Sequence, residues 1–201
     1  APIVFLIDRA GFVGSDGRTH QGLFDLSYLS LMPNMTVLAP KDASELSLMI
    51  EHALTLNAPV AIRYPNGKNE PIASLTSFSR VGEWEILLEG SKVMMLAVGP
   101  RLNRLALKVA KQFNGEVGVI NARSVKPLDV DILKGCFGKT LITLEENSLK
   151  GGFGESVLSY LSSANITADV ITLAVKDEFV LHATVDEQLE VNGFTEENLK
   201  N

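Results

Sequence analysis

A short loop near the start of the chain concentrates groups that can transfer protons. The stretch GSDGRTHQG, residues 14–22, holds Asp16 and His20 four positions apart between glycines. A histidine with a pKa near neutrality can shuttle a proton, and a carboxylate can orient it or bind a hydroxyl. The glycines let the backbone turn and approach a ligand closely. The stretch is either a catalytic or binding loop or a polar surface loop, and its density of functional groups favours a site.

Two arginines follow apolar runs that read as strands. Arg9 lies just beyond PIVFLI, and Arg63 ends the run VAIR. In open α/β sheets, ligands bind beyond the carboxyl ends of the strands. Two guanidiniums at neighbouring strand ends would bind a phosphate or carboxylate by paired hydrogen bonds. The alternative is that each arginine pairs with a nearby carboxylate such as Asp8 or Asp25.

Other motifs carry weaker signals. A glycine-rich turn in EENSLKGGFGES, residues 145–156, could cradle a phosphate at a helix N-terminus, but it lacks the residues of known nucleotide loops. We interpret it as a tight turn before a helix, with Glu145 and Glu146 as capping or interface groups. A magnesium site at Asp16 would need a second ligand, and the next asparagine along the chain is Asn34, within MPNMT. The sequence therefore gives little support to a magnesium site at Asp16.

The remaining histidines and the single cysteine indicate no further site. His52 lies in an amphipathic helical segment and His182 before a terminal one, a spacing that does not suggest zinc. Cys136 cannot form an internal disulfide and fits a reducing compartment. No G-x-S-x-G elbow is present, so a serine hydrolase is not indicated.

Composition and charge bound the class of protein. The chain has 201 residues, 46% of them hydrophobic and 21% charged, with a net charge of −6. This length allows one large or two small domains with a real core. No basic stripe and no membrane-length apolar run appear, which argues against nucleic acid and membrane as partners. The short apolar start has no basic leader or cleavage site, so we expect no signal peptide and a cytoplasmic location.

The elements that must position these residues alternate between strand and helix. Apolar β-rich runs predict strands, and helical periodicity predicts a helix capped by Asp42 and Glu45 with an apolar face beginning at Leu46. This alternation predicts an α/β fold with a parallel, doubly wound sheet. Strands are predicted at 2–7, 36–38, 60–63, 84–90, 92–98, 116–122, 140–147 and 168–175. Helices are predicted from 42 to about 56 and at 101–113, 128–135, 152–162, 183–190 and 195–200.

The pattern divides the chain in two. Residues 65–81 contain two prolines and an Asn-Gly and are predicted to be a linker. The segment before it has three strands and one clear helix, too few to cover both faces of a parallel sheet. We therefore predict that 1–75 is the back part of a domain and that 76–201 is a complete one. The start with Ala inside a strand-like run suggests a fragment or a processed chain.

Five stretches, in order along the chain, resemble the family of 1-deoxy-D-xylulose-5-phosphate synthases, which are transketolase-like enzymes. The most specific is DRAGFVGSDGRTHQGLFDLSYLSLMPNMTVLAPKD at 8–42. The others are VAIRYPNG at 60–67, RSVKPLD at 123–129, LEENSLKGGFG at 144–154 and DEFVLHATVDEQLEVNGFTEENL at 177–199. Transketolase and pyruvate dehydrogenase β-type subunits share the architecture but differ at the first stretch.

The resemblance implies a fold and a reaction. Family members are transferases that condense pyruvate with glyceraldehyde 3-phosphate and release carbon dioxide, using thiamine diphosphate and magnesium. Their product feeds the synthesis of isoprenoids, thiamine and pyridoxal. The implied fold is α/β, with an incomplete pyrimidine-binding-type parallel sheet in 1–75 and a complete transketolase C-terminal-type domain in 76–201. A homo-oligomer such as a homodimer is expected, because a truncated sheet exposes apolar faces and edges.

The resemblance also assigns roles to residues. Arg9 and Arg63 match arginines that hold the phosphate of the acceptor substrate, and Asp16 and His20 match residues that face the thiamine adduct and the acceptor hydroxyls. A carboligation forms an alkoxide that needs a proton and an acceptor aldehyde that must be oriented. The family often has Arg where this chain has Asn66, and no role is assigned to Asn66.

The resemblance places the cofactor's anchors outside this stretch of sequence. The family's magnesium and diphosphate motif and its activating glutamate belong to earlier parts of the protein. Glu45 and Glu51, on a later helix, do not replace that glutamate. We therefore expect no cofactor or metal bound to this chain and no activity from it alone. The alternatives are a non-catalytic assembly module formed mainly by 82–201, and the C-terminal subunit of a split transketolase-like enzyme.

Overall fold

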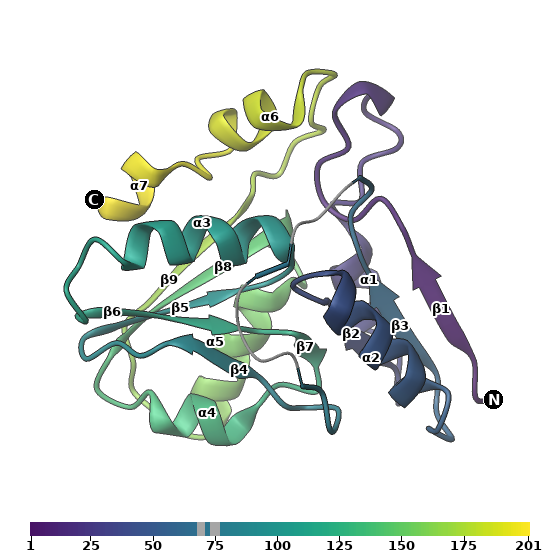
Figure 1. Ribbon diagram of the computed structural model, residues 1–201, viewed down its shortest axis with the longest axis horizontal. Coiled ribbons are helices and arrows are strands. Elements are labelled where there is room, and N and C mark those ends of the chain that lie inside the picture. The colour runs from purple at the N-terminus through teal and green to yellow at the C-terminus, as the bar shows by residue number, and fades with distance from the viewer. Residues whose placement is uncertain (68–70, 73–76) are drawn as a thin grey trace.

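The computed structural model describes residues 1–67, 71–72 and 77–201, and these form a mixed α/β fold with two sheets (Figure 1). The first sheet has the order β1-β3-β2-β7 and the second the order β4-β6-β5-β8-β9. The predicted α/β class is confirmed. The strands are β1 Val4–Ile7, β2 Thr36–Leu38, β3 Val60–Arg63, β4 Glu85–Leu88, β5 Val93–Ala97, β6 Val117–Asn121, β7 Ser124–Lys126, β8 Thr140–Ser148 and β9 Val170–Val175.

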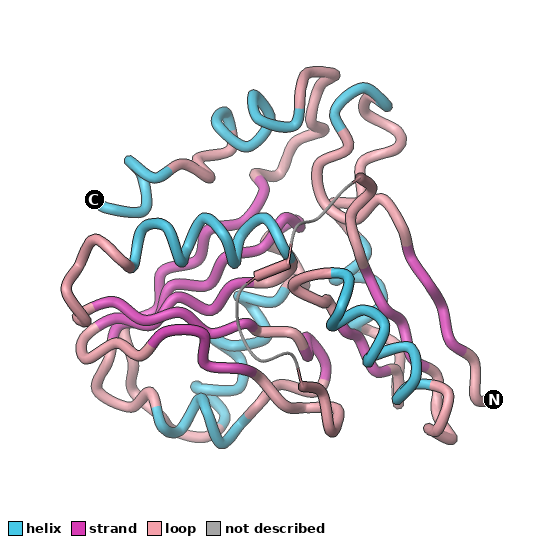
Figure 2. Tube along the Cα trace, in the orientation of Figure 1, coloured by secondary structure: helices cyan, strands magenta, loops and turns pink. Residues whose placement is uncertain are grey.

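Helices cover both faces of the second sheet (Figure 2). Side chains of β5 alternate between two cores: Met94 and Leu96 pack with α4 and α5, whereas Met95 and Ala97 pack with α3. This alternation is the period-two pattern of a strand buried on both faces. The helices are α1 Asp25–Ser30, α2 Ala43–Ala53, α3 Pro100–Ala110, α4 Val130–Gly135, α5 Phe153–Ser163, α6 Val185–Val191 and α7 Glu196–Lys200, with a 3-10 turn at Gly14–Asp16.

The predicted parallel pairing holds for most neighbouring strands and is wrong for two of them. β4 runs antiparallel to β6, and β7 runs antiparallel to β2. Only four residues connect β4 to β5, which is too short for the crossover that parallel strands require. This connection passes the start of β6, where Gly90 lies close to Gly118. A Cβ on Gly90 would lie 2.0 Å from the Gly118 nitrogen, so the close approach requires glycine.

The two predicted parts of the chain share one core. Leu26, Val37 and Ala61 from the first part lie in the same buried cluster as Trp84 and Met94 from the second. β7, which the sequence did not predict as a strand, adds to the first sheet although it lies beyond residue 76. The division at 75/76 stays a prediction. Of the predicted linker 65–81, residues 68–70 and 73–76 lie outside the described residues, and the rest contains neither helix nor strand.

The start of α2 confirms the predicted cap in part. The Asp42 carboxylate accepts from the Glu45 N–H at 2.9 Å, as a capping residue does. The Glu45 carboxylate, however, accepts from the Lys41 N–H at 2.6 Å rather than from that of Asp42. Glu45 is instead part of a buried ionic cluster between the two sheets. Within the described residues, no helix is long and apolar enough to cross a membrane.

Candidate functional site

The ends of β1 and β3 place Arg9 and Arg63 at neighbouring positions along one sheet edge. β1 and β3 are parallel, with Ile7 opposite Arg63, and the Ala10 N–H donates to the Tyr64 carbonyl at 3.0 Å. Arg9 itself has a left-handed backbone with φ of 58°, which turns the chain away from the sheet as β1 ends. The backbones are therefore adjacent, as the strand pattern predicted.

The guanidinium of Arg63 is engaged inside the protein. Its Nε lies 2.8 Å from each carboxylate oxygen of Asp25, and its Nη2 donates to the carbonyls of Gly22 at 2.8 Å and Glu146 at 2.7 Å. Its side chain is only 3% exposed. The alternative that Arg63 pairs with Asp25 is confirmed, and its assignment to a substrate phosphate stays a prediction.

The guanidinium of Arg9, in contrast, lies at the surface beside the loop of residues 14–22. Its Nε is 3.3 Å from Asp16 Oδ2, and the two side chains are 48% and 29% exposed. An exposed ion pair of this kind is weak, so a bound anion or hydroxyl can compete for either partner. The structure therefore brings Arg9 and Asp16 together, whereas Arg63 has a separate set of buried partners.

His20 occupies the outer part of the same loop. Its Nδ1 lies 2.9 Å from Thr19 Oγ1, and both residues are exposed. An open cavity of about 490 Å³ lies beside the residues on either side of it and is lined by Arg18, Thr19, Gln21, Phe24 and Phe179. The rings of Phe24 and Phe179 meet edge to face at 6.2 Å. His20 itself is not among the lining residues, but its chain neighbours Thr19 and Gln21 are, and the cavity has one cationic side and one aromatic side.

A backbone pair closes the base of the loop. The Gly11 N–H donates to the Gly22 carbonyl at 2.8 Å, and the Gly22 N–H returns a bond to the Gly11 carbonyl at 3.0 Å. Gly22 cannot carry a side chain, because a Cβ there would lie 2.2 Å from the Arg9 carbonyl oxygen. Within the loop, Gln21 Oε1 accepts from the Val13 N–H at 2.7 Å. These bonds make residues 11–22 a closed loop rather than an open surface segment.

Side chains at the carboxyl end of β8 form hydrogen bonds with the backbone of the loop and of α1. Glu146 Oε1 accepts from the Phe12 N–H at 3.3 Å and from Arg101 Nη1 at 2.7 Å. Asn147 Oδ1 accepts from the Leu26 N–H at 3.1 Å. These residues belong to the LEENS stretch. The only sequence signal of this role was a run of polar residues at the end of a predicted strand. Sequence reasoning did not connect them with the loop.

Glu145, next along β8, acts as a helix cap. Its carboxylate accepts from the N–H groups of Phe153 at 2.7 Å and Gly154 at 2.8 Å, at the start of α5. The interpretation of Glu145 as a capping group is confirmed, and Glu146 is an interface group. Burial raises the pKa of Glu145 to about 7, against the lowering effect of these N–H donors and of Arg63. Its carboxyl is therefore partly protonated near neutral pH.

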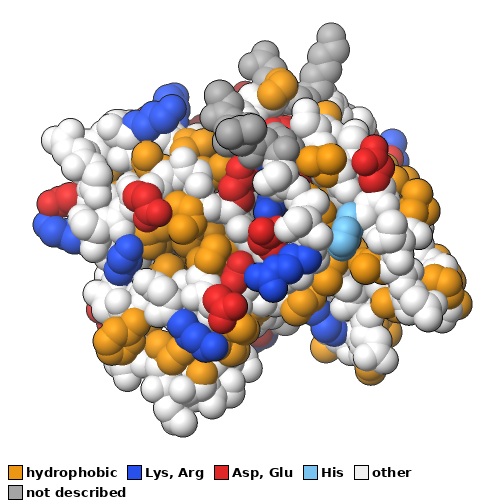
Figure 3. Space-filling view, turned by 60° about the horizontal axis from the view of Figure 1, so that its bottom comes forward, with side chains coloured by type: hydrophobic (Ala, Val, Ile, Leu, Met, Phe, Trp, Pro, Cys, Tyr) orange, Lys and Arg blue, Asp and Glu red, His pale blue; other side chains and the backbone are white. Residues whose placement is uncertain are grey.

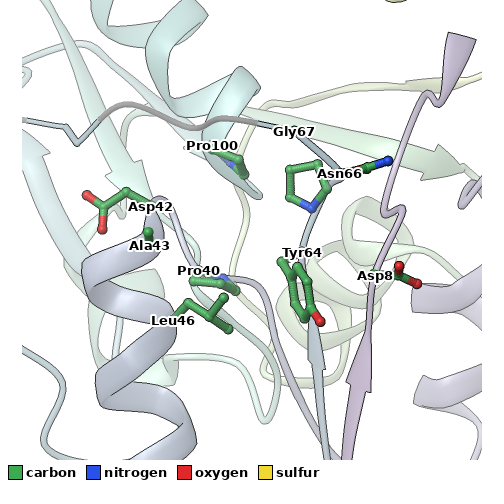
Figure 4. A pocket seen from close by; sticks show the side chains of 10 residues that line it. Asp8, Pro40, Asp42, Ala43, Leu46, Tyr64, Asn66, Gly67 and Pro100 are labelled. Atoms are coloured by element: carbon green, nitrogen blue, oxygen red, sulfur yellow. The ribbon is translucent and has the colours of Figure 1, made fainter.

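A second cavity, of about 350 Å³, lies at the carboxyl ends of β1 and β3 (Figure 4). Asp8, Pro40, Asp42, Tyr64 and Asn66 are among the residues that line it, and Pro100 closes one side. Asp42 is occupied by its cap and by the Ile72 N–H at 3.2 Å from Oδ2. Neither Arg9, Arg63, Asp16 nor His20 lines this cavity, so it is separate from the loop site.

Among the described residues, no group of three or more His, Cys, Asp or Glu side chains is placed to hold a metal ion. On the face that Figure 3 shows, acidic and basic side chains are interspersed, and the described residues form no continuous basic patch there. The exposed side chains of Arg9, Asp16 and His20 have the chemistry to bind a small polar molecule and to exchange a proton with it.

Two family models cover most of the chain. The model described as "Transketolase, C-terminal domain" matches residues 82–199, and that described as "Transketolase, pyrimidine binding domain" matches residues 1–70.

Curated proteins named 1-deoxy-D-xylulose-5-phosphate synthase are similar over nearly the whole chain. The one from Clostridium tetani is 44% identical over 201 residues, and the one from Carboxydothermus hydrogenoformans is 45% identical over 205. Each alignment covers 98% of this chain but only 32% and 33% of the relative. The chain thus spans about a third of the length of these relatives.

Solved structures show the same fold. A protein titled "Split gene transketolase, inactive beta4 tetramer" superposes with a TM-score of 0.84 at 27% identity, covering 98% of this chain and 63% of that one. A transketolase from Campylobacter jejuni superposes with a TM-score of 0.80 at 19% identity, covering 98% of this chain and 30% of that one.

Proposed function

This chain belongs to the transketolase family, and from that premise we propose that it forms the acceptor-facing part of a 1-deoxy-D-xylulose-5-phosphate synthase. The intact enzyme would be a transferase that condenses pyruvate with glyceraldehyde 3-phosphate and releases carbon dioxide. Its product would enter isoprenoid, thiamine and pyridoxal synthesis in the cytoplasm. The observation that carries the proposal is the closed loop that presents Asp16 and His20 beside Arg9, in a chain 44% identical to a synthase of that name.

The proposed roles follow from the exposure of each group. The Arg9 guanidinium binds the acceptor's phosphate, because it is exposed and holds only a weak pair with Asp16. Asp16 accepts a hydrogen bond from an acceptor hydroxyl, and the His20 imidazole supplies a proton to the alkoxide that carbon–carbon bond formation leaves. Arg63, buried against Asp25, is better placed to hold the loop than to bind the phosphate.

We further propose that thiamine diphosphate and magnesium are held by residues other than those described here. The support is the lack of a metal-binding group among the described residues and the one-third span of the synthase relatives. No step of the chemistry is assigned to the cofactor from this structure. It follows that Ala1–Asn201 alone should not turn over substrate.

A chimera tests the proposed reaction. In it, Ala1–Asn201 replaces the matching third of the Clostridium tetani relative. We expect it to consume pyruvate only when glyceraldehyde 3-phosphate is present and to form the five-carbon sugar phosphate. The control is the unmodified relative under the same conditions. A chimera that folds and assembles like the relative but forms no product would contradict the proposal.

A second candidate function is that of a C-terminal subunit in a split enzyme. The observation that favours it is the similarity to a protein whose title names a split-gene transketolase. In that case a separate chain carries the cofactor site, and mixing the two chains should restore turnover without fusion. A purely non-catalytic assembly module would bind such a chain equally well after Asp16 and His20 are replaced, and turnover would not depend on them.

We propose that the chain self-associates. β1 is an edge strand of the first sheet, and Ile3, Phe5 and Leu6 in and beside it are 47%, 42% and 50% exposed. Exposed apolar edge strands favour pairing with another chain. Sedimentation velocity at increasing concentration should show dimers or larger species, and Phe5→Lys should shift the distribution toward monomer. The matched control is Phe137→Lys, an exposed phenylalanine just beyond α4. A monomer at all concentrations would overturn this proposal.

A further inference from the structure

Gln188 in α6 makes a long-range contact with the start of the loop. Its Oε1 accepts from the Gly14 N–H at 3.0 Å, and its Nε2 donates to the Leu181 carbonyl at 2.8 Å. The residue is 2% exposed. Both ends of the amide are satisfied, and a flipped amide would place donor against donor and acceptor against acceptor. An apolar side chain at this position would leave a buried N–H and a buried carbonyl without partners.

The packing around Gly14 supports the same contact. Gly14 has a left-handed φ of 71°, and a Cβ added to it would meet Ala183 O at 3.2 Å and Val185 Cγ2 at 3.3 Å. Phe12, fully buried, packs edge to face against Phe194 at 5.9 Å. The C-terminal segment from Ala183 to Phe194 therefore packs against the loop just before its 3-10 turn and at the first residue of that turn.

The turn that Gln188 holds carries Asp16. Gly14 is the first residue of the turn Gly14–Asp16, and Gly17 ends it with φ of 74°. Asp16 itself makes only exposed contacts, with Arg9 at 3.3 Å and Ser15 at 3.5 Å. The buried bond at Gly14 is thus the firmer attachment of this turn.

We infer that Gln188 is a positioning residue that fixes the Gly14–Asp16 turn and thereby sets where the Asp16 carboxylate lies. The inference deepens the proposed function and rests on it only for the role of Asp16. It gives helix α6, which lies outside the loop, a specific part in the site.

Hydrogen exchange of the full chain tests this inference without any need for turnover. In Gln188→Leu, peptides covering residues 12–24 should exchange about tenfold faster or more, because a buried hydrogen bond is lost, while peptides from α3 and β5 should be unchanged. The control is Glu190→Gln, an exposed position on the same helix. Unchanged exchange in 12–24, or equal acceleration in α3 and β5, would overturn the inference.

A conservative variant gives a second test that remains usable if Gln188→Leu does not fold. In Gln188→Glu, the protonated carboxyl can accept from the Gly14 N–H and donate to the Leu181 carbonyl. The ionised carboxylate has no proton to donate and would be buried facing the Leu181 carbonyl. Exchange rates are corrected for the pH dependence of intrinsic amide exchange. At about pH 5 the corrected rate of residues 12–24 should approach that of the wild type, and at about pH 8 it should be several-fold faster than in the wild type. The wild type at both pH values controls for other titrating groups. Loop exchange in this variant that matches wild type at both values would contradict the role of the amide. Because the readout is independent of catalysis, an inactive chimera would leave this result intact.

Discussion

Replacing His20 by alanine in the chimera is expected to lower kcat/KM for glyceraldehyde 3-phosphate by about 10²–10⁴-fold, the range that a positioned general acid or base contributes. His20 is exposed in a loop whose base is closed by the Gly11–Gly22 pair. Its replacement removes no buried contact, so the chimera should keep its stability. Steady-state kinetics with thermal unfolding as a check would separate loss of chemistry from loss of fold.

His52→Ala is the matched control for that experiment. His52 lies in α2, where its ring packs edge to face against Phe78 at 5.3 Å, away from the loop. Its replacement should change kcat/KM by less than about twofold, as is usual for a residue outside the reacting groups. Equal effects of the two substitutions, or full activity in His20→Ala, would show that the loop histidine takes no part in proton transfer.

Glu45→Ala is expected to destabilise the chain by about 3–5 kcal/mol, the effect of removing one partner from a buried ion pair. The Glu45 carboxylate is fully buried and lies 3.0 Å from Arg123 Nη1, 3.1 Å from Asn121 Nδ2 and 3.5 Å from Lys41 Nζ. Lys41 would retain Glu85 at 2.7 Å and Arg123 would retain Glu83 at 3.3 Å, but Arg123 would lose its closest carboxylate. The large effect follows from leaving cationic groups buried with too few partners.

Urea unfolding of the chain measures this effect, and Glu51→Ala is its control. Glu51 lies on the exposed side of the same helix, so its replacement should change the free energy of unfolding by less than about 0.5 kcal/mol. Since Glu45 on α2 contacts Asn121 at the end of β6, its loss should also weaken the attachment between the two sheets. Similar stability of the two variants would mean that the buried cluster contributes little.

Periodicity in the sequence was sufficient to predict the long helices and the buried strands. α2, α3 and α5 each run for 11 residues with an apolar face, β5 is a continuous apolar run, and β6 is apolar up to its final Asn121. The elements that were missed are short. β7 has three residues and is a strand because it pairs with β2, and the six-residue α1 begins at Asp25, which is bound by Arg63. Tertiary contacts, rather than local pattern, determine both.

In the candidate site too, features encoded by adjacent residues were predictable and features that depend on tertiary contacts were not. The loop with Asp16 and His20 was predictable because its functional groups and glycines are adjacent in sequence. The burial of Arg63 was not, since Asp25 lies 38 positions away and the sequence offers both this carboxylate and a substrate anion as its partner. The supports from Glu146 and Gln188 join residues 134 and 174 positions apart, and only the fold brings them to the loop.

Turnover by Ala1–Asn201 itself, measured beside the chimera, tests most directly the claim that this chain contributes one part of a shared site. Both proteins would be supplied with pyruvate, glyceraldehyde 3-phosphate, thiamine diphosphate and magnesium, and product would be followed by mass spectrometry. We predict product from the chimera and none above the buffer background from the chain alone. Product formed by the chain alone would contradict the account, because the cofactor would then be held by residues that this structure does not assign to it.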